Sequence, residues 1–196
     1  MNAVKNYNLP SGKKLEIFLD GCPESPREWD NLGTIIAYGR DYRHWTETKE
    51  YADMDFQELA ESIEKAGGII FPIWGYEHSG LSIKTGERNY PFTDYFDAGL
   101  FGAIFCTDER LGKEYGNDTE AKEKAKKVLT GEVEVLNQYF NGDVYGYVLS
   151  DIADESGIMD EVDSCWGFYG ADITVNGILE AVDINAADIA YIKEHV

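Results

Sequence analysis

Short apolar segments separated by turn residues predict a series of β-strands along the chain. One of them contains Pro72, which favours the edge of a sheet or a bulge because proline cannot donate a ladder hydrogen bond. The last two flank a stretch rich in Asp and Glu, so we expect them to form a hairpin. The predicted strands are Lys14–Leu19, Thr34–Tyr38, Ile69–Trp74, Leu81–Ile83, Gly102–Phe105, Val144–Leu149 and Val162–Tyr169.

Apolar positions that recur every three or four residues predict four helices. Asp55 suits the N-cap of the first one, and Gly67 and Gly68 follow its end. The second helix is long, and its apolar stripe indicates that one face is buried. The predicted helices are Phe56–Ala66, a segment from Asn117 or Asp118 to Asn141, 173–182 and 186–195. The stripe consists of Ala121, Ala125, Val128, Leu129, Val133, Leu136 and Phe140.

The order of these elements favours the α+β class. Strands and helices are mixed without the regular alternation that a parallel sheet requires. A chain of 196 residues is long enough for a substantial core in one domain or two small ones. We therefore expect residues 1–196 to form a single α+β domain. Its mainly antiparallel sheet would pack against one long helix and shorter helices.

Acidic side chains outnumber basic ones, above all near the end of the chain. The sequence holds 37 Asp and Glu against 17 Lys and Arg, a formal net charge of −20. Residues 151–196 hold 11 acidic side chains and one basic one, Lys193. Contacts with phosphate groups need an excess of Lys and Arg, so this balance argues against direct binding of DNA, RNA or anionic lipid.

This excess of negative charge either keeps the protein soluble or attracts a basic partner. For a basic partner, the acidic segment between the last two predicted strands is the expected contact surface. Its contact residues would be Asp151, Asp154, Glu155, Asp160, Glu161 and Asp163.

The cellular setting follows from apolar runs and cysteines. No apolar run approaches the roughly 20 residues of a membrane-spanning helix, and no secretory signal is visible. Cys22, Cys106 and Cys165 are isolated and odd in number, so they form neither a zinc motif nor a disulfide framework. We expect a cytoplasmic protein with reduced thiols, in which Cys106 and Cys165 are small core residues.

Signatures of common enzymes are absent from the sequence, including a glycine-rich phosphate loop, HExxH and GxSxG. We therefore predict no catalytic residues and no cofactor. The acidic segment does not fit an EF-hand, because Ser156 falls where the turn glycine is needed. A metal site is an open alternative, since two imidazoles and a carboxylate suit iron or zinc. Its candidate ligands are His44, His78, Asp94, Asp97 and Asp163.

The 13 tyrosines and 4 tryptophans cluster in segments such as DVYGYV and SCWGFYG. For most of them, packing in the core of a sheet is the simpler interpretation. Aromatic rings beside carboxylates can also bind Arg and Lys through ion pairs and cation–π contacts together. Such a surface offers negative charge and flat rings, as nucleic acid does.

Five separated segments resemble a family of small proteins encoded by bacteriophages and prophages. The segments are WDNLGTIIAYGRDY, FPIWGYEHSGLSI, YFDAGLFGAIF, EVEVLNQYFNGDVYGYVL and DSCWGFYG, in this order. The resemblance covers roughly residues 13–170. It implies a phage gene product with an early or accessory role, and it assigns no catalytic residue to this chain.

Two functional hypotheses follow. The first is a phage-encoded inhibitor of a host CRISPR effector or restriction enzyme, acting as an acidic DNA mimic. It predicts a basic nucleic-acid-binding host protein as partner and a continuous acidic face on the chain. The alternative is a small phage enzyme, with or without a metal, whose pocket contains His78 and carboxylates among Asp30, Asp97 and Asp163.

Overall fold

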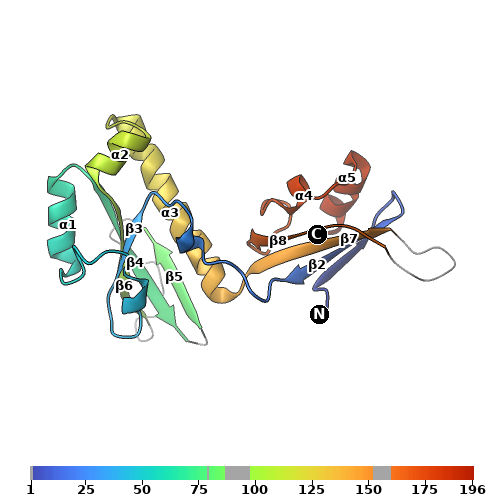
Figure 1. Ribbon diagram of the computed structural model, residues 1–196, viewed down its shortest axis with the longest axis horizontal. Coiled ribbons are helices and arrows are strands. Elements are labelled where there is room, and N and C mark those ends of the chain that lie inside the picture. The colour runs from blue at the N-terminus through green and yellow to red at the C-terminus, as the bar shows by residue number, and fades with distance from the viewer. Residues whose placement is uncertain (1, 79, 87–97, 152–159) are drawn as a thin grey trace. The chain divides into compact units, whose positions relative to one another are not determined.

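The computed structural model describes residues 2–78, 80–86, 98–151 and 160–196 (Figure 1). It contains 34% helix and 31% strand, with two antiparallel sheets and one long helix, which confirms the predicted α+β class. Contacts divide the chain into two compact units. Unit 1 consists of Met1–Glu24 and Gly142–Val196, and unit 2 is Ser25–Asn141. The further expectation that residues 1–196 act as a single domain stays a prediction.

Unit 1 is a four-stranded antiparallel sheet with helices on one face (Figure 1). Its strands lie in the order β1 (Lys5–Asn8), β2 (Lys13–Leu19), β7 (Val144–Asp151) and β8 (Glu161–Tyr169). The predicted hairpin of the last two strands is confirmed. β1 was not predicted, because Tyr7 is the one apolar side chain in KNYN. The core between sheet and helices includes Leu15, Ile17, Tyr147, Leu149, Ile178, Leu179 and Ile192.

The helices of unit 1 are α4 (Ile178–Ala181) and α5 (Ala186–His195). The longer helix predicted over 173–182 is wrong for its first half. There, the Thr174 amide and hydroxyl donate to the Asp172 carboxylate at 2.9 and 2.7 Å, which stabilises a turn instead. Gly177 then adopts a φ of 98°, a conformation outside the right-handed helix, so the helix begins only after it.

Unit 2 contains a second antiparallel sheet with a helix on each face (Figure 1). Its strands lie in the order β3 (Thr34–Ala37), β6 (Ala98–Cys106), β4 (Ile69–Glu77) and β5 (Leu81–Thr85). The long helix α3 (Thr119–Asn141) packs on one face, and α1 (Phe56–Lys65) packs on the other. The remaining elements are α2 (Asp108–Glu114) and the short 3₁₀ helices η1 (Pro26–Glu28) and η2 (Arg43–Trp45).

The helix signals of unit 2 are confirmed in detail. Asp55 caps α1 and forms a capping box with Glu58, each side chain accepting from the other's backbone N–H. Asp118 accepts the Ala121 amide at 2.8 Å, which identifies it as the cap of α3. The predicted stripe of α3 faces the core, with these members fully buried: Ala121, Ala125, Leu129, Val133 and Leu136.

Pro72 lies in an internal strand, and the sheet accommodates it by a local change of pairing. β4 lies between β6 and β5 in the strand order, but β5 pairs only with Ile73–Glu77, so Pro72 lies where β4 is locally an edge of the sheet, and a bulge follows between Ile73 and Trp74. Pairing with β5 ends at Ile73, so no β5 residue pairs with Pro72. The Thr85 hydroxyl donates to the Pro72 carbonyl at 2.7 Å and closes this side of the strand.

A buried ion-pair network holds the loop before β3 against α3. Arg27 donates to Glu47 at 2.6 and 3.0 Å, to Glu132 at 2.9 Å and to the Gly33 carbonyl at 2.7 Å. Glu132 also accepts the amides of Leu32 and Gly33, at 2.7 and 3.2 Å. The side chains of Arg27 and Glu132 are only 7% and 10% exposed. The DNLG segment therefore has a structural role, because its amides satisfy a buried carboxylate.

Candidate functional site

The predicted acidic site lies at one end of the β7–β8 hairpin of unit 1. Asp151 ends β7, and its N–H donates to the Asp160 carbonyl at 3.0 Å, so these residues are cross-strand neighbours. Glu161 begins β8, directly after Asp160. All three carboxylate side chains are exposed. The structure thus brings together three of the predicted contact residues, whereas Asp154 and Glu155 lie outside the described residues.

Asp163, the remaining predicted contact residue, has a partner inside unit 1. Its carboxylate accepts a 2.7 Å hydrogen bond from the hydroxyl of Tyr147, which is 1% exposed. Burial, together with this hydrogen bond, raises the pKa of Tyr147 above its usual value. Asp163 therefore stabilises the sheet in addition to contributing negative charge near the site.

We expect the burial of Tyr147 to make the fold sensitive to alkaline pH. The unfolded chain loses this proton near pH 10.0, whereas the folded protein, with its raised pKa, keeps it. Stability is therefore complete below that pH and falls as the pH rises above it. The measurement is the urea concentration at which the amides of β7 lose half of their protection from hydrogen exchange, from about pH 8 to about pH 11. This concentration should decrease at the upper end of the pH range. Tyr147→Phe should make the fall smaller, and equal falls in both proteins would contradict the raised pKa.

Two lysines of β2 offset part of the acidity at the hairpin end. Lys13 lies directly opposite Asp151 in the pairing of β2 with β7. Lys14 forms an ion pair with Glu16 at 2.8 Å. Both lysines are far from the acidic segment in the sequence, so only the strand pairing reveals that they are its neighbours.

An aromatic row crosses the face of the unit 1 sheet that is opposite the helices. Phe18, Gly146 and Trp166 are register partners on β2, β7 and β8. The rings of Phe18 and Trp166 are 6.0 Å apart between centroids and tilted by 41°. A Cβ at Gly146 would collide with the indole ring, so glycine is what allows Trp166 to lie over the strand. Trp166 is nevertheless 43% exposed, which leaves much of the indole open to solvent.

The cysteines divide into one buried and two exposed thiols. Cys106 is buried in β6 as predicted, and burial raises its pKa to about 11. Cys165 is exposed, so the prediction that it is a core residue is wrong. The reason is its place in β8, the outermost strand of its sheet, where most side chains are exposed. Cys22 is also exposed.

A thiol reagent should distinguish these three positions. We expect Cys22 and Cys165 to react rapidly near neutral pH, and Cys106 to react only when unit 2 opens, because the thiolate is the reactive form. Mass spectrometry of peptides labelled in native buffer and in urea measures this directly. Rapid labelling of Cys106 in native buffer would contradict its burial.

The residues considered for an enzyme are distributed over the two units. His78 follows β4 and is exposed, with its ring stacked on Tyr76 at 6.1 Å between centroids. Asp30 forms an ion pair with Arg110 at 2.9 Å in unit 2, whereas Asp163 belongs to unit 1. Asp94 and Asp97 lie outside the described residues. The ring of the other histidine candidate, His44, lies 5.3 Å from the ring of Trp45 between centroids.

Among the side chains that the structure describes, no group of three His, Cys, Asp or Glu is placed to hold a metal ion. Within the same residues, no helix combines the length and the apolar character needed to cross a membrane.

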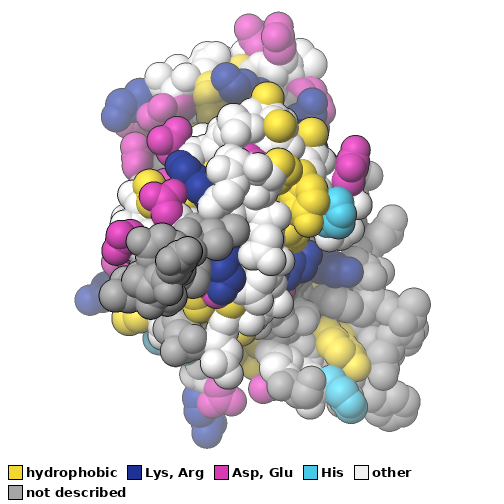
Figure 2. All heavy atoms as spheres, turned by 90° about the vertical axis from the view of Figure 1, so that its right-hand side faces the viewer, with side chains coloured by type: hydrophobic (Ala, Val, Ile, Leu, Met, Phe, Trp, Pro, Cys, Tyr) yellow, Lys and Arg dark blue, Asp and Glu magenta, His cyan; other side chains and the backbone are white. Residues whose placement is uncertain are grey.

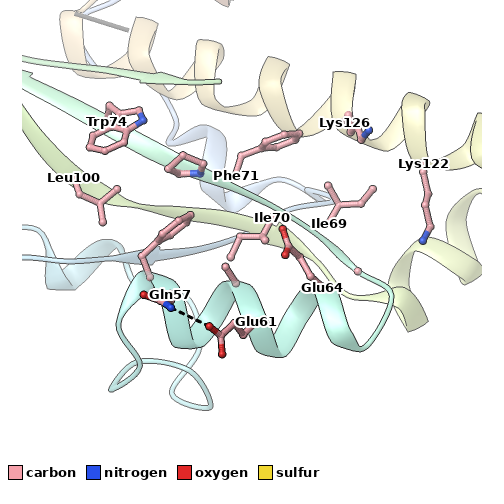
Figure 3. Close-up of a pocket in the computed structure, with 14 residues that line it drawn as sticks. Gln57, Glu61, Glu64, Ile69, Ile70, Phe71, Trp74, Leu100, Lys122 and Lys126 are labelled. Carbon is pink, nitrogen blue, oxygen red and sulfur yellow. Dashed lines mark hydrogen bonds between the residues drawn. The ribbon is translucent and has the colours of Figure 1, made fainter. Parts of the chain in front are cut away.

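A groove of about 900 Å³ in unit 2 is a surface that sequence reasoning missed (Figure 3). Its floor includes Phe71, Trp74 and Leu100. Acidic side chains of α1 and lysines of α3 stand on its two sides, and Gln57 donates to Glu61 at 3.0 Å. The groove lies beside the part of β4 that has no β5 partner, so a helical or strand pattern alone gives no signal for it.

The surface charge is less concentrated than the composition suggests. Figure 2 shows the face seen from the right-hand side of Figure 1, where described Asp and Glu side chains form several separate groups. Lys, Arg and hydrophobic side chains lie between these groups. Among the described side chains of this face, acidic ones are therefore interspersed with basic and apolar ones.

No family model matches the chain, and neither the curated proteins nor the solved structures include a significant match to it.

Proposed function

We propose that the chain is a phage-encoded inhibitor of a host nucleic-acid-targeting defence system, either a CRISPR effector or a restriction enzyme. In this proposal unit 1 binds a basic groove of the host protein and takes the place of DNA there. The observation that carries the proposal is the charge of unit 1. It holds 15 Asp and Glu against four Lys and no Arg, a net charge of −11.

The geometry of unit 1 supports this use of the charge. Asp151, Asp160 and Glu161 are all exposed at the hairpin end, where Arg or Lys side chains of a partner can pair with them. The exposed indole of Trp166 lies on β8, the strand that begins with Glu161. Carboxylates and a flat ring on one small unit supply the two features by which basic grooves bind nucleic acid, negative charge and stacking.

Inhibition of this kind requires no chemistry from the chain. The inhibitor and DNA compete for one groove, so association is steered by charge and weakens as salt rises. The effect is stoichiometric, and a large excess of DNA relieves it. An enzyme of the alternative hypothesis would act at amounts far below those of its target.

The proposal is tested in two steps. The tagged chain is first used to capture proteins from bacterial lysate at low salt, and the captured proteins are eluted with increasing salt and identified. A purified candidate is then assayed for DNA binding with and without the chain. We expect one chain to block one binding site, with relief by added DNA and weaker inhibition at high salt. Inhibition that is independent of salt, or that excess DNA does not relieve, would overturn the proposal.

A further inference from the structure

We propose that the aromatic row of unit 1 is a binding surface for arginine side chains of the partner protein. The surface consists of Phe18, Gly146 and Trp166, with the carboxylates of Glu16 and Glu161 on the same face. The inference rests on the proposed function, because it names the side chains by which a basic groove would be recognised.

Among the described residues of unit 1, no helix lies on this face of the sheet. Leu15, Ile17 and Tyr147 point to the opposite face, where they pack with α4 and α5. Successive side chains of a strand point to alternate faces, so Phe18 and Gly146, the neighbours of Ile17 and Tyr147, belong to the other one. Figure 1 shows both helices on the same side of the unit 1 sheet.

Trp166 is held in place before any partner binds. Gly146 provides the space beneath its indole, and Phe18 contacts it from β2. An indole fixed in this way loses little side-chain freedom when a ligand stacks on it. Its exposed ring face suits a planar cation, and tryptophan is the best of the aromatic residues for cation–π contacts.

Carboxylates lie near the Trp166 ring on the same face of the sheet. Glu16 pairs with Val148, one row from the aromatic residues, and its carboxylate forms a 2.8 Å ion pair with Lys14 of the same face, for which a partner's arginine would compete. Glu161 pairs with Ser150, one row further on. The Ser164 hydroxyl donates to Glu161 at 2.8 Å, which places both side chains on this face. Rows of an antiparallel sheet that share a face lie about 7 Å apart, so an arginine that stacks on Trp166 reaches the row of Glu16 and Ser164, and Glu161 is hydrogen-bonded to that Ser164. Carboxylates accept two hydrogen bonds from one guanidinium, which a lysine ammonium cannot imitate.

Charge also selects between possible occupants of this face. A nucleobase could stack on the indole, but the net charge of −11 of unit 1 opposes a phosphate backbone. A second copy of the chain would bring the same charge against itself. A surface rich in arginine is the occupant that satisfies the ring and the carboxylates together.

The test compares two peptides of equal length and charge, an oligo-arginine and an oligo-lysine, against the full chain by titration calorimetry. We expect wild type to bind the arginine peptide about fivefold more tightly than the lysine peptide. Trp166→Leu should remove this preference. The matched control is Trp29→Leu, because Trp29 of unit 2 is 44% exposed and Trp166 is 43% exposed. The control variant should keep the preference.

A second measurement keeps the test valid if Trp166→Leu folds poorly. In wild type, the indole N–H signal of Trp166 should shift in an NMR titration with the arginine peptide, while that of Trp29 stays in place. Equal affinity for the two peptides, or equal loss in both variants, would overturn the inference. It would also be overturned if an oligothymidine shifted the Trp166 signal instead, or if wild type dimerised and Trp166→Leu did not.

Failure of this inference is distinguishable from failure of the proposed function. If Trp166→Leu inhibits the host target as strongly as wild type does, the arginine surface is wrong and the acidic mimic stands. If the arginine preference depends on Trp166 but the chain inhibits no DNA-binding protein, the surface stands and the proposed function is wrong.

Discussion

Replacing Glu132 by alanine should destabilise unit 2 by about 3–5 kcal/mol. The substitution leaves the guanidinium of Arg27 with one carboxylate partner in a site where its side chain is only 7% exposed. It also removes the acceptor of the Leu32 and Gly33 amides, which adds the cost of unsatisfied donors. Because the chain has two units, the free energy of opening is best measured by hydrogen exchange of amides in β3 and β6.

The matched control for this prediction is Glu134→Ala, two residues further along α3. Glu134 is exposed, so its removal should change the stability by no more than about 0.5 kcal/mol. Arg27→Ala should cost about as much as Glu132→Ala, and the double variant should cost less than the sum of the two, because they remove one shared interaction. Equal effects of Glu132→Ala and Glu134→Ala would show that the network contributes nothing.

Neutralising the acidic segment should weaken partner binding on the order of a hundredfold. Six side chains are replaced by their amides, at about 0.5 kcal/mol for each exposed ion pair that is lost. The positions are Asp151, Asp154, Glu155, Asp160, Glu161 and Asp163. The variant should fold normally, because repulsion between negative charges decreases. An amide at position 163 also still accepts the hydrogen bond from the Tyr147 hydroxyl.

A control with the same loss of charge separates a specific surface from net charge. Six exposed glutamates of unit 2 are replaced by glutamine: Glu61, Glu64, Glu109, Glu114, Glu123 and Glu134. Affinity and its dependence on salt are measured for both variants with the captured partner. We expect the unit 2 variant to bind within a few fold of wild type. If both variants lose affinity equally, the partner senses the total charge of the chain and not the hairpin of unit 1.

Elements with local signals could be predicted from the sequence, and elements without them could not. α1 and α3 have a cap, an apolar stripe and a glycine after their last turn, so their limits were found closely. α2 was missed because Leu111 is its one buried residue, which gives no stripe. β1 was missed because KNYN has a single apolar side chain, and that side chain is buried by a strand and helices distant in the sequence.

The same distinction applies to the candidate site. The acidic residues between two strand patterns were visible as a hairpin, and three of them do lie together. Lys13 and the aromatic row could not be foreseen, because they depend on the pairing of β2 with β7 across all of unit 2. The interpretation of Cys165 as a core residue failed for a related reason. An apolar neighbourhood in sequence does not reveal that its strand is the outermost one of a sheet.

The insertion of unit 2 between two neighbouring strands of unit 1 has a consequence for synthesis on the ribosome. β1 and β2 emerge first, but two strands alone are only marginally stable, and their partner β7 follows after the whole of unit 2. We therefore expect unit 2 to be protected from protease in arrested nascent chains before β1 and β2 are. The carboxylates and Trp166 that face the proposed partner come later still, with β8. Under the proposed function, a chain released before β8 is made would lack the surface that binds the partner.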